Sequence, residues 1–243
     1  DGVDIDCETF YRRLRDSKSL PSSTQPTVEE FKDFYVRLGD ICCGVVCVLA
    51  SSEISGTVDS ALAAREQIPD VPVVVVDSHF SAMGQGLIAI QAAKAAASGK
   101  PIEDVAKIAE QVRDKTELLF VVDTLEYLHK GGRIGGAKRL LGTALNIKPI
   151  LHFEKGVIQP LSQTRTKKKG VLELLDIAEE RLRDRPMAEA AVVHVDCYEE
   201  GQILVKQVAE RFNPPIIHIS DVSPVVGTHV GPGGLGLAFY PAD

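Results

Sequence analysis

The chain contains no tryptophan, and its aromatic content is only 5%. Because 44% of its 243 residues are nevertheless hydrophobic, we expect a core built mainly from valine, isoleucine, leucine and alanine. No stretch approaches the roughly 18 consecutive apolar residues of a membrane-spanning helix, and the sequence shows no signal-peptide pattern. We therefore expect a globular protein of one large domain or two small ones.

A basic surface and a metal-binding cysteine pattern are also missing. The net charge of −7 argues against a general nucleic-acid binder, which needs a positively charged footprint. The five cysteines show neither the paired CxxC nor the Cys/His spacing of a zinc site, so we expect no metal and no other cofactor. Cys42, Cys43 and Cys47 lie in one apolar run, which favours buried thiols in a reducing compartment. We therefore expect a cytoplasmic protein.

Three continuous apolar runs mark the first part of the chain, at residues 41–50, 71–76 and 118–122. Runs without alternation are typical of strands buried on both faces of a parallel sheet. Helices are expected between them, and the segment from Thr27 to Glu30 has the pattern of a capping box. The expected helices cover residues 28–38, 58–67, 84–98 and 102–115. This alternation predicts an α/β architecture with a largely parallel sheet and flanking helices.

The pattern changes after about residue 140. Residues 147–153 and 157–158 predict a β-hairpin whose turn, at 154–156, contains a glycine. Further helices are expected at 168–183 and 199–212, and further strands at 190–195, 216–219 and 235–239. We therefore predict a second α/β domain with a mixed sheet. The predicted domains are residues 1–143 and 144–243.

Two glycine-rich segments match nucleotide-binding motifs only in part. Residues 231–236 have the letters GxGxxG, but the helix and acidic residue of a dinucleotide site have no room after them in this sequence. Residues 131–138 approach a phosphate-binding P-loop, but Ala137 stands where the lysine is required. The sequence therefore predicts no nucleotide site.

Ser55 follows the first apolar run, at the turn into the next predicted helix. Ligands of open α/β sheets bind beyond the carboxyl ends of the strands, and the amides of Gly56 and Thr57 at a helix N-terminus would favour an anion. Two alternatives stay open. Ser55 could cap the helix, or act as a nucleophile, although its neighbours do not form a GxSxG elbow.

Two further positions offer a titratable or cationic side chain beside glycines. His229 lies in the segment Gly227–Gly233, where we expect a glycine-rich turn and a better exposed histidine than His194 or His218; the alternative is a structural histidine. Arg133 follows two glycines and can bind a carboxylate or pair with an internal acid. The cationic segment 165–169 predicts either a solvated helix start or a docking patch for an acidic partner or a membrane surface.

Four motifs in a fixed order together resemble the DegV family of bacterial fatty-acid-binding proteins. They are Ser22-Ser23-Thr24-Gln25-Pro26, Ile54-Ser55-Gly56-Thr57, the segment from Leu125 to Gly131-Gly132-Arg133, and Gly227 to Gly233. The resemblance covers nearly the whole chain. It implies two α/β domains with a long-chain fatty acid held in a tunnel between them. It also implies the substrate-binding subunit of a fatty-acid kinase, in which a separate subunit brings ATP and phosphorylates the bound carboxylate for phospholipid synthesis.

The resemblance assigns roles by position. The fatty-acid carboxylate is assigned to Ser23, Thr24, Ser55, Gly56, Arg133 and His229. Ser23 stands where the family usually has threonine, and Thr24 is the alternative if the register is shifted. Docking of the kinase subunit is assigned to Arg165, with Lys167 beside it. Family members begin with a strand ahead of the point where this sequence starts, so we expect the first strand segment of the N-terminal domain to be missing here.

The expected partners are thus a long-chain fatty acid, the ATP-binding kinase subunit and, transiently, a membrane surface, but no nucleic acid. On this interpretation the chain is not an enzyme on its own. Two other functions stay open. An autonomous serine acyl hydrolase or transferase would turn over an ester without a partner or ATP. A lipid-sensing or transport protein would hold its ligand without any kinase acting on it.

Overall fold

The computed structural model describes residues 2–17, 19–142 and 147–242, and the chain divides into two compact units. The smaller unit is Thr24–Lys115, and the larger one combines Asp1–Ser23 with Thr116–Asp243. The boundary expected between residues 143 and 144 lies outside the described residues. The observed division differs from it, because the strand at Glu117–Val121 pairs with strands of the later part of the chain.

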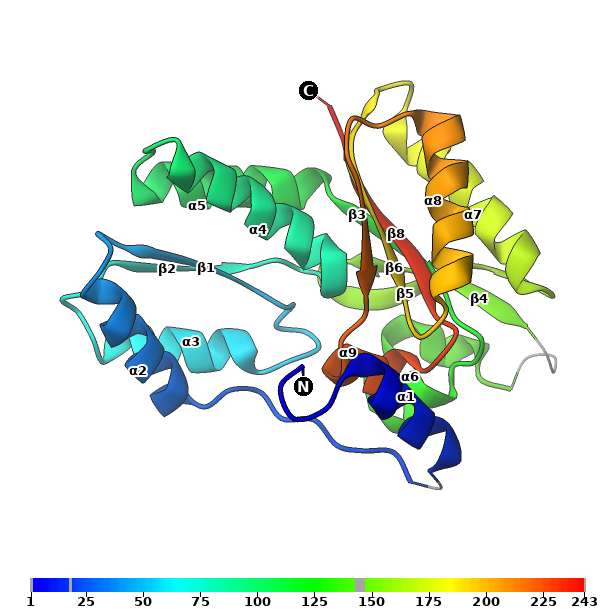
Figure 1. Ribbon diagram of the computed structural model, residues 1–243, viewed down its shortest axis with the longest axis horizontal. Helices are drawn as coiled ribbons and strands as arrows, with labels where there is room; N and C mark the ends of the chain where they lie inside the picture. Colours follow the sequence, from blue (N-terminus) through cyan, green and yellow to red (C-terminus); the bar gives the residue numbers. More distant parts are fainter. Residues whose placement is uncertain (1, 18, 143–146, 243) are drawn as a thin grey trace. The chain divides into compact units, whose positions relative to one another are not determined.

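A two-stranded parallel sheet organises the smaller unit. Its elements are α2 (Val28–Gly39), β1 (Val45–Leu49), α3 (Thr57–Glu66), β2 (Val73–Asp77), α4 (Ala82–Ala97) and α5 (Ile102–Lys115). Helices α4 and α5 lie on one face of the sheet and α2 and α3 on the other (Figure 1). The capping box predicted at Thr27 is confirmed. Thr27 Oγ1 accepts the Glu30 amide hydrogen at 3.2 Å, and the Glu30 carboxylate accepts the Thr27 amide hydrogen at 2.7 Å.

Strand β1 is shorter than the apolar run that predicted it. The amides of Ile41 and Cys42 bond to the Leu38 carbonyl, so these residues form the turn after α2. The expectation of buried thiols is therefore wrong for Cys42 and Cys43, which are exposed. Cys47, within the strand, is partly buried against the core that α2 and α3 share.

A mixed sheet with the order β5-β4-β3-β8-β6-β7 organises the larger unit. The elements are α1 (Cys7–Asp16), β3 (Glu117–Val121), α6 (Glu126–Lys130), the 3-10 helix η1 (Gly135–Leu140), β4 (Lys148–Glu154), β5 (Val157–Thr164), α7 (Lys167–Leu182), β6 (Met187–His194), α8 (Tyr198–Phe212), β7 (Ile217–Asp221), α9 (Pro224–Val230) and β8 (Leu235–Pro241). The prediction that β3 belongs to a parallel sheet is wrong, since β3 is antiparallel to both β4 and β8. An apolar run signals burial of both faces and does not encode strand direction.

The core of the larger unit lies between the sheet and the helices α7 and α8, which share one side of it (Figure 1). Leu119 and Val121 of β3 face this core together with Leu174 of α7 and Leu204 of α8. The predicted β4–β5 hairpin is confirmed, and its turn residues Lys155 and Gly156 have φ of 48° and 84°. Across the described ranges, no helix is long and apolar enough to cross a membrane.

Candidate functional site

Ser23 and His229 lie side by side in the larger unit. The Oγ of Ser23 is 2.8 Å from Nε2 of His229, although 206 residues separate them in sequence. His229 is in the last turn of α9, so the prediction that it lies in a glycine-rich turn is wrong. Pro224 in the first turn favours this short helix, and Gly231, with φ of 80°, ends it. The histidine is consequently only partly exposed.

The Gly131-Gly132-Arg133 segment ends α6 with a Schellman motif. The Gly132 amide donates to the His129 carbonyl at 3.1 Å, and the Arg133 amide to the Leu128 carbonyl at 3.0 Å. Gly132 supplies the positive φ, 73°, that this motif requires. The Nη1 of Arg133 then donates to the Gly131 carbonyl at 2.8 Å. This bond holds the guanidinium, at the end of the arginine side chain, against the turn.

Arg133 and His229 influence each other electrostatically. Burial lowers the pKa of His229 below its ordinary value, and the nearby Arg133 charge lowers it further. The imidazole is therefore neutral near pH 7. Arg133 is the cation of this cluster.

Ser55 belongs to the smaller unit, in the turn between β1 and α3. Its Oγ lies 2.7 Å from Oγ1 of Thr57 and accepts the Thr57 amide hydrogen at 3.3 Å. Its own amide donates to the Ser51 carbonyl at 3.1 Å. Gly56, not Ser55, is the N-cap residue of α3 and offers no side-chain cap. Ser55 accepts the amide hydrogen of Thr57, the first residue of α3, but it does not cap the helix as an N-cap residue would. The hydroxyl pair retains a hydrogen for a ligand.

The Thr24–Gln25 segment approaches the same turn. A Cβ on Gly56 would lie 2.9 Å from Nε2 of Gln25, so a larger residue at position 56 would displace this side chain. Thr24 is exposed, and its Oγ1 bonds to the Gln25 carbonyl at 3.3 Å. Ser23, by contrast, belongs to the larger unit. The predicted site residues therefore fall into two groups, each within its own unit: Ser23, Arg133 and His229 in the larger, and Thr24, Ser55 and Gly56 in the smaller.

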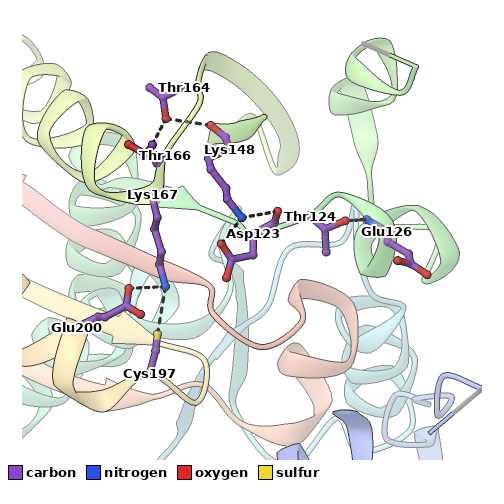
Figure 2. A network of polar contacts seen from close by, with 9 residues as sticks. All are labelled: Asp123, Thr124, Glu126, Lys148, Thr164, Thr166, Lys167, Cys197 and Glu200. Atoms are coloured by element: carbon purple, nitrogen blue, oxygen red, sulfur yellow. Dashed lines mark hydrogen bonds and ion pairs between the residues drawn. The ribbon is translucent and has the colours of Figure 1, made fainter. Parts of the chain in front are cut away.

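The two predicted docking residues differ in exposure. Arg165 is exposed, whereas the Lys167 side chain is only 15% exposed and its Nζ lies 2.6 Å from Oε2 of Glu200. The same nitrogen is 3.8 Å from Sγ of Cys197 (Figure 2). Thr166 caps α7 by accepting the Lys169 amide hydrogen at 3.3 Å. Lys167 has an intramolecular partner, so Arg165 is the better placed of the two for an external contact.

A second polar pair in this unit was not anticipated from the sequence. Nζ of Lys148, at the start of β4, lies 2.6 Å from Oδ1 of Asp123, just after β3 (Figure 2). The Thr164 hydroxyl donates to the Lys148 carbonyl at 3.5 Å. The signal that could have found Asp123 is an acidic residue at the end of an apolar run, next to the segment that carries Arg133.

Comparison with known proteins identifies the family. The model of the DegV family, described as "Uncharacterised protein, DegV family", matches residues 1–242. A DegV domain-containing protein of Clostridium acetobutylicum is 37% identical over 241 residues, which are 98% of this chain and 84% of that protein.

Two solved structures have the same fold. The chain matches a DegV family protein from Thermus thermophilus, described by its fatty acid binding, with a TM-score of 0.93 and 29% identity over 99% of this chain and 86% of that one. It matches DegV of Bacillus subtilis, described as a fatty acid binding protein, with a TM-score of 0.89 and 32% identity over 99% and 86% of the two chains. The chain therefore belongs to the DegV family.

Proposed function

We propose that this protein binds a long-chain fatty acid and presents its carboxylate to a separate kinase subunit, which forms the acyl phosphate from ATP. The observation that carries the proposal is the hydrogen-bonded pair of Ser23 and His229 within the field of Arg133. This cluster combines hydrogen-bond donors with one positive charge, which suits an anionic head group. The fatty acid binding described for the two related structures supports the ligand class.

The energetics favour such a ligand. Burial of an acyl chain of about sixteen carbons contributes on the order of 12 kcal/mol, at roughly 0.8 kcal/mol per CH₂, before the cost of ordering. The carboxylate must keep hydrogen bonds once it leaves water. Ser23 and Ser55 offer hydroxyl groups for this purpose without a fixed charge. The two hydroxyls are separate candidates, and Ser55→Ala tests the second of them.

Neutral donors also suit the chemistry that follows. In acyl-phosphate formation a carboxylate oxygen attacks the terminal phosphorus of ATP, and ADP leaves. Positioning provides most of the catalysis of phosphoryl transfer, and a carboxylate held by hydroxyl groups keeps its nucleophilic oxygen. Arg165, exposed ahead of α7, is the candidate contact for the kinase subunit.

The serine hydrolase alternative has less support. A nucleophilic serine needs a base within hydrogen-bonding distance of its hydroxyl, and the Ser55 hydroxyl is instead paired with Thr57. Hydrolysis of an acyl ester by the isolated protein would nevertheless favour this alternative over a binding role.

Native mass spectrometry of the purified protein, followed by analysis of its denatured organic extract, tests the proposal directly. We expect a bound mass equal to that of a long-chain fatty acid. Addition of a kinase subunit and ATP should then yield acyl phosphate. A protein that is empty and takes up neither oleate nor palmitate would refute the binding step, whereas a loaded protein on which no kinase acts would point to sensing or transport.

A further inference from the structure

We propose that Gly131 is a positioning residue that holds His229 as the tautomer with its hydrogen on Nε2, so that Ser23 donates its hydroxyl hydrogen to the ligand. Because the Ser23 hydroxyl then donates to the ligand, the cluster favours a head group that only accepts hydrogen bonds, such as an ionised carboxylate. The identity of the ligand rests on the proposed function. The tautomer itself does not, and it can be measured on the free protein.

Nδ1 of His229 is buried and has no hydrogen-bond partner among the described residues. A Cβ added to Gly131 would overlap this nitrogen, so the glycine backbone lies directly against it. A hydrogen on Nδ1 would point at this backbone without an acceptor, which is costly for a buried donor. A bare Nδ1 facing a Cα–H group leaves only a weakly unsatisfied acceptor.

Neutral imidazole carries one ring hydrogen, so one ring nitrogen donates and the other accepts. With Nδ1 bare, Nε2 carries the hydrogen and donates it to Ser23 Oγ across 2.8 Å. The serine oxygen is then the acceptor of that bond, and its own hydrogen points elsewhere. Ser23 therefore donates outward, and His229 cannot remove its proton.

The tautomer of His229 decides whether Ser23 can serve in binding or as a nucleophile. A serine nucleophile requires the lone pair of the base to face the hydroxyl hydrogen, which is the opposite tautomer. In the arrangement proposed here Ser23 presents its O–H to a ligand, and the guanidinium of the nearby Arg133 can likewise only donate. The lowered pKa of His229 supports this, because it favours the neutral ring in the ligand-free protein.

The imidazole of His229 can pack against residue 131 only because this residue has no side chain. Gly131 has an ordinary backbone conformation, whereas Gly132 provides the positive φ of the turn. Backbone freedom therefore does not require glycine at position 131. The close approach of His229 on α9 and of the Tyr127 carbonyl oxygen, which would lie 2.9 Å from an added Cβ, requires it, so Gly131→Ala should displace the imidazole and also shift the end of α6.

The decisive measurement is the ¹⁵N NMR spectrum of His229 in the ligand-free full chain near pH 7, assigned by comparison with His229→Gln. We expect the hydrogen on Nε2 and a bare Nδ1. In Gly131→Ala we expect a changed tautomer population and about tenfold weaker palmitate binding, the size of one lost hydrogen bond to a charged group. A wild-type spectrum with the hydrogen on Nδ1 would overturn the proposal, whatever the variant does.

A pair of His229 variants provides a second test that does not depend on the folding of Gly131→Ala. Glutamine can still donate from a position close to that of Nε2, but it cannot act as a base, and leucine can do neither. We expect His229→Gln to retain palmitate binding within a few-fold and His229→Leu to lose about tenfold or more. Equal losses in both variants would overturn the donor role. If the wild-type protein shows the expected tautomer but binds no fatty acid, the proposed function fails while the tautomer assignment stands.

Discussion

The ammonium nitrogen of Lys148 lies 2.6 Å from a carboxylate oxygen of Asp123 and 3.1 Å from the carbonyl oxygen of the same residue. The two residues are 25 positions apart, at the end of β3 and the start of β4. Arg133 lies in the chain between them. The ion pair therefore closes the loop that carries the cation of the candidate site.

Lys148→Met should lower the free energy of unfolding by about 1 kcal/mol, the upper range for a pair that is partly exposed. The Lys148 and Asp123 side chains are 25% and 40% exposed. Lys130→Met is the matched control, since its pair with Glu126 is 56% and 57% exposed and should contribute a few tenths of a kcal/mol at most. Urea denaturation measures both variants, and equal losses would contradict a special role for Lys148.

Gly231→Ala should be strongly destabilising for two separable reasons. Gly231 has φ of 80°, and a Cβ there would also overlap the ring of Tyr127. Gly99 has the same φ of 80° with nothing within 4 Å of an added Cβ, so Gly99→Ala measures the backbone cost alone. We expect about 1 kcal/mol for Gly99→Ala and about 2 kcal/mol more for Gly231→Ala from overpacking. Equal losses of unfolding free energy in the two variants would show that the Tyr127 ring moves aside at no measurable cost.

Ser55→Ala should weaken fatty-acid retention and the rate of phosphorylation together, each by about tenfold. The reason is the loss of a hydroxyl that can reach an anion at the start of α3. Ser52→Ala is the control, because it removes a hydroxyl of the same turn that is bonded to Asp77 at 2.5 Å. It shows how far a general disturbance of this turn weakens retention. Normal turnover in Ser55→Ala with a functional kinase subunit would eliminate Ser55 as a carboxylate contact.

His152 should make the larger unit less stable in acid. Burial lowers its pKa below the ordinary 6.5, Arg181 lowers it further, and Glu154 opposes both. The unfolded chain therefore takes up this proton more readily than the folded one. The free energy of unfolding should be fully maintained above pH 6.5 and fall as the pH drops below it.

The dependence on His152 can be isolated by substitution. Between about pH 7.5 and about pH 5.5, His152→Gln should lose less stability than the wild type in urea titrations. His194 and His229 also have lowered pKa values, so the pH dependence should be reduced without disappearing. An unchanged pH dependence in His152→Gln would rule out this histidine as a contributor.

Arg165→Glu should slow phosphorylation by a kinase subunit without changing fatty-acid retention. The expected effect is about tenfold at low salt and smaller at high salt, because an exposed charge contributes mainly to association. Lys155→Glu changes the charge equally at the β4–β5 turn, where residue 155 is also exposed. If both variants slow the reaction alike, net charge and not docking at Arg165 is responsible.

Local signals in the sequence were sufficient for several elements. The capping box at Thr27 predicted the start of α2, because its two hydrogen bonds join residues three positions apart. The hairpin turn at Lys155 and Gly156 predicted the pairing of β4 with β5. Helix α5 begins and ends as predicted, at Ile102 and Lys115. In each case the interactions that specify the element lie within a few residues.

Other features depended on contacts between distant residues. The antiparallel pairing of β3 with β8 joins Glu117 to Phe239, and nothing in the β3 run indicates its partner. The glycines around His229 predict a turn, yet Gly227 and Gly231 lie within and just after a helical segment. Glycine has more than one use, and here Gly131 and Gly231 provide room for neighbouring rings.

The sequence alone determined the α/β class, most of the helices and strands, and the four motifs that place the chain in its family, because these depend on composition, local hydrogen bonding and residue order. The tertiary structure alone decided that Ser23 meets His229, that burial and the nearby Arg133 charge lower the pKa of His229, and that Lys167 is paired with Glu200 while Arg165 is exposed. These properties arise from atoms brought within a few ångströms by packing between elements far apart in the chain.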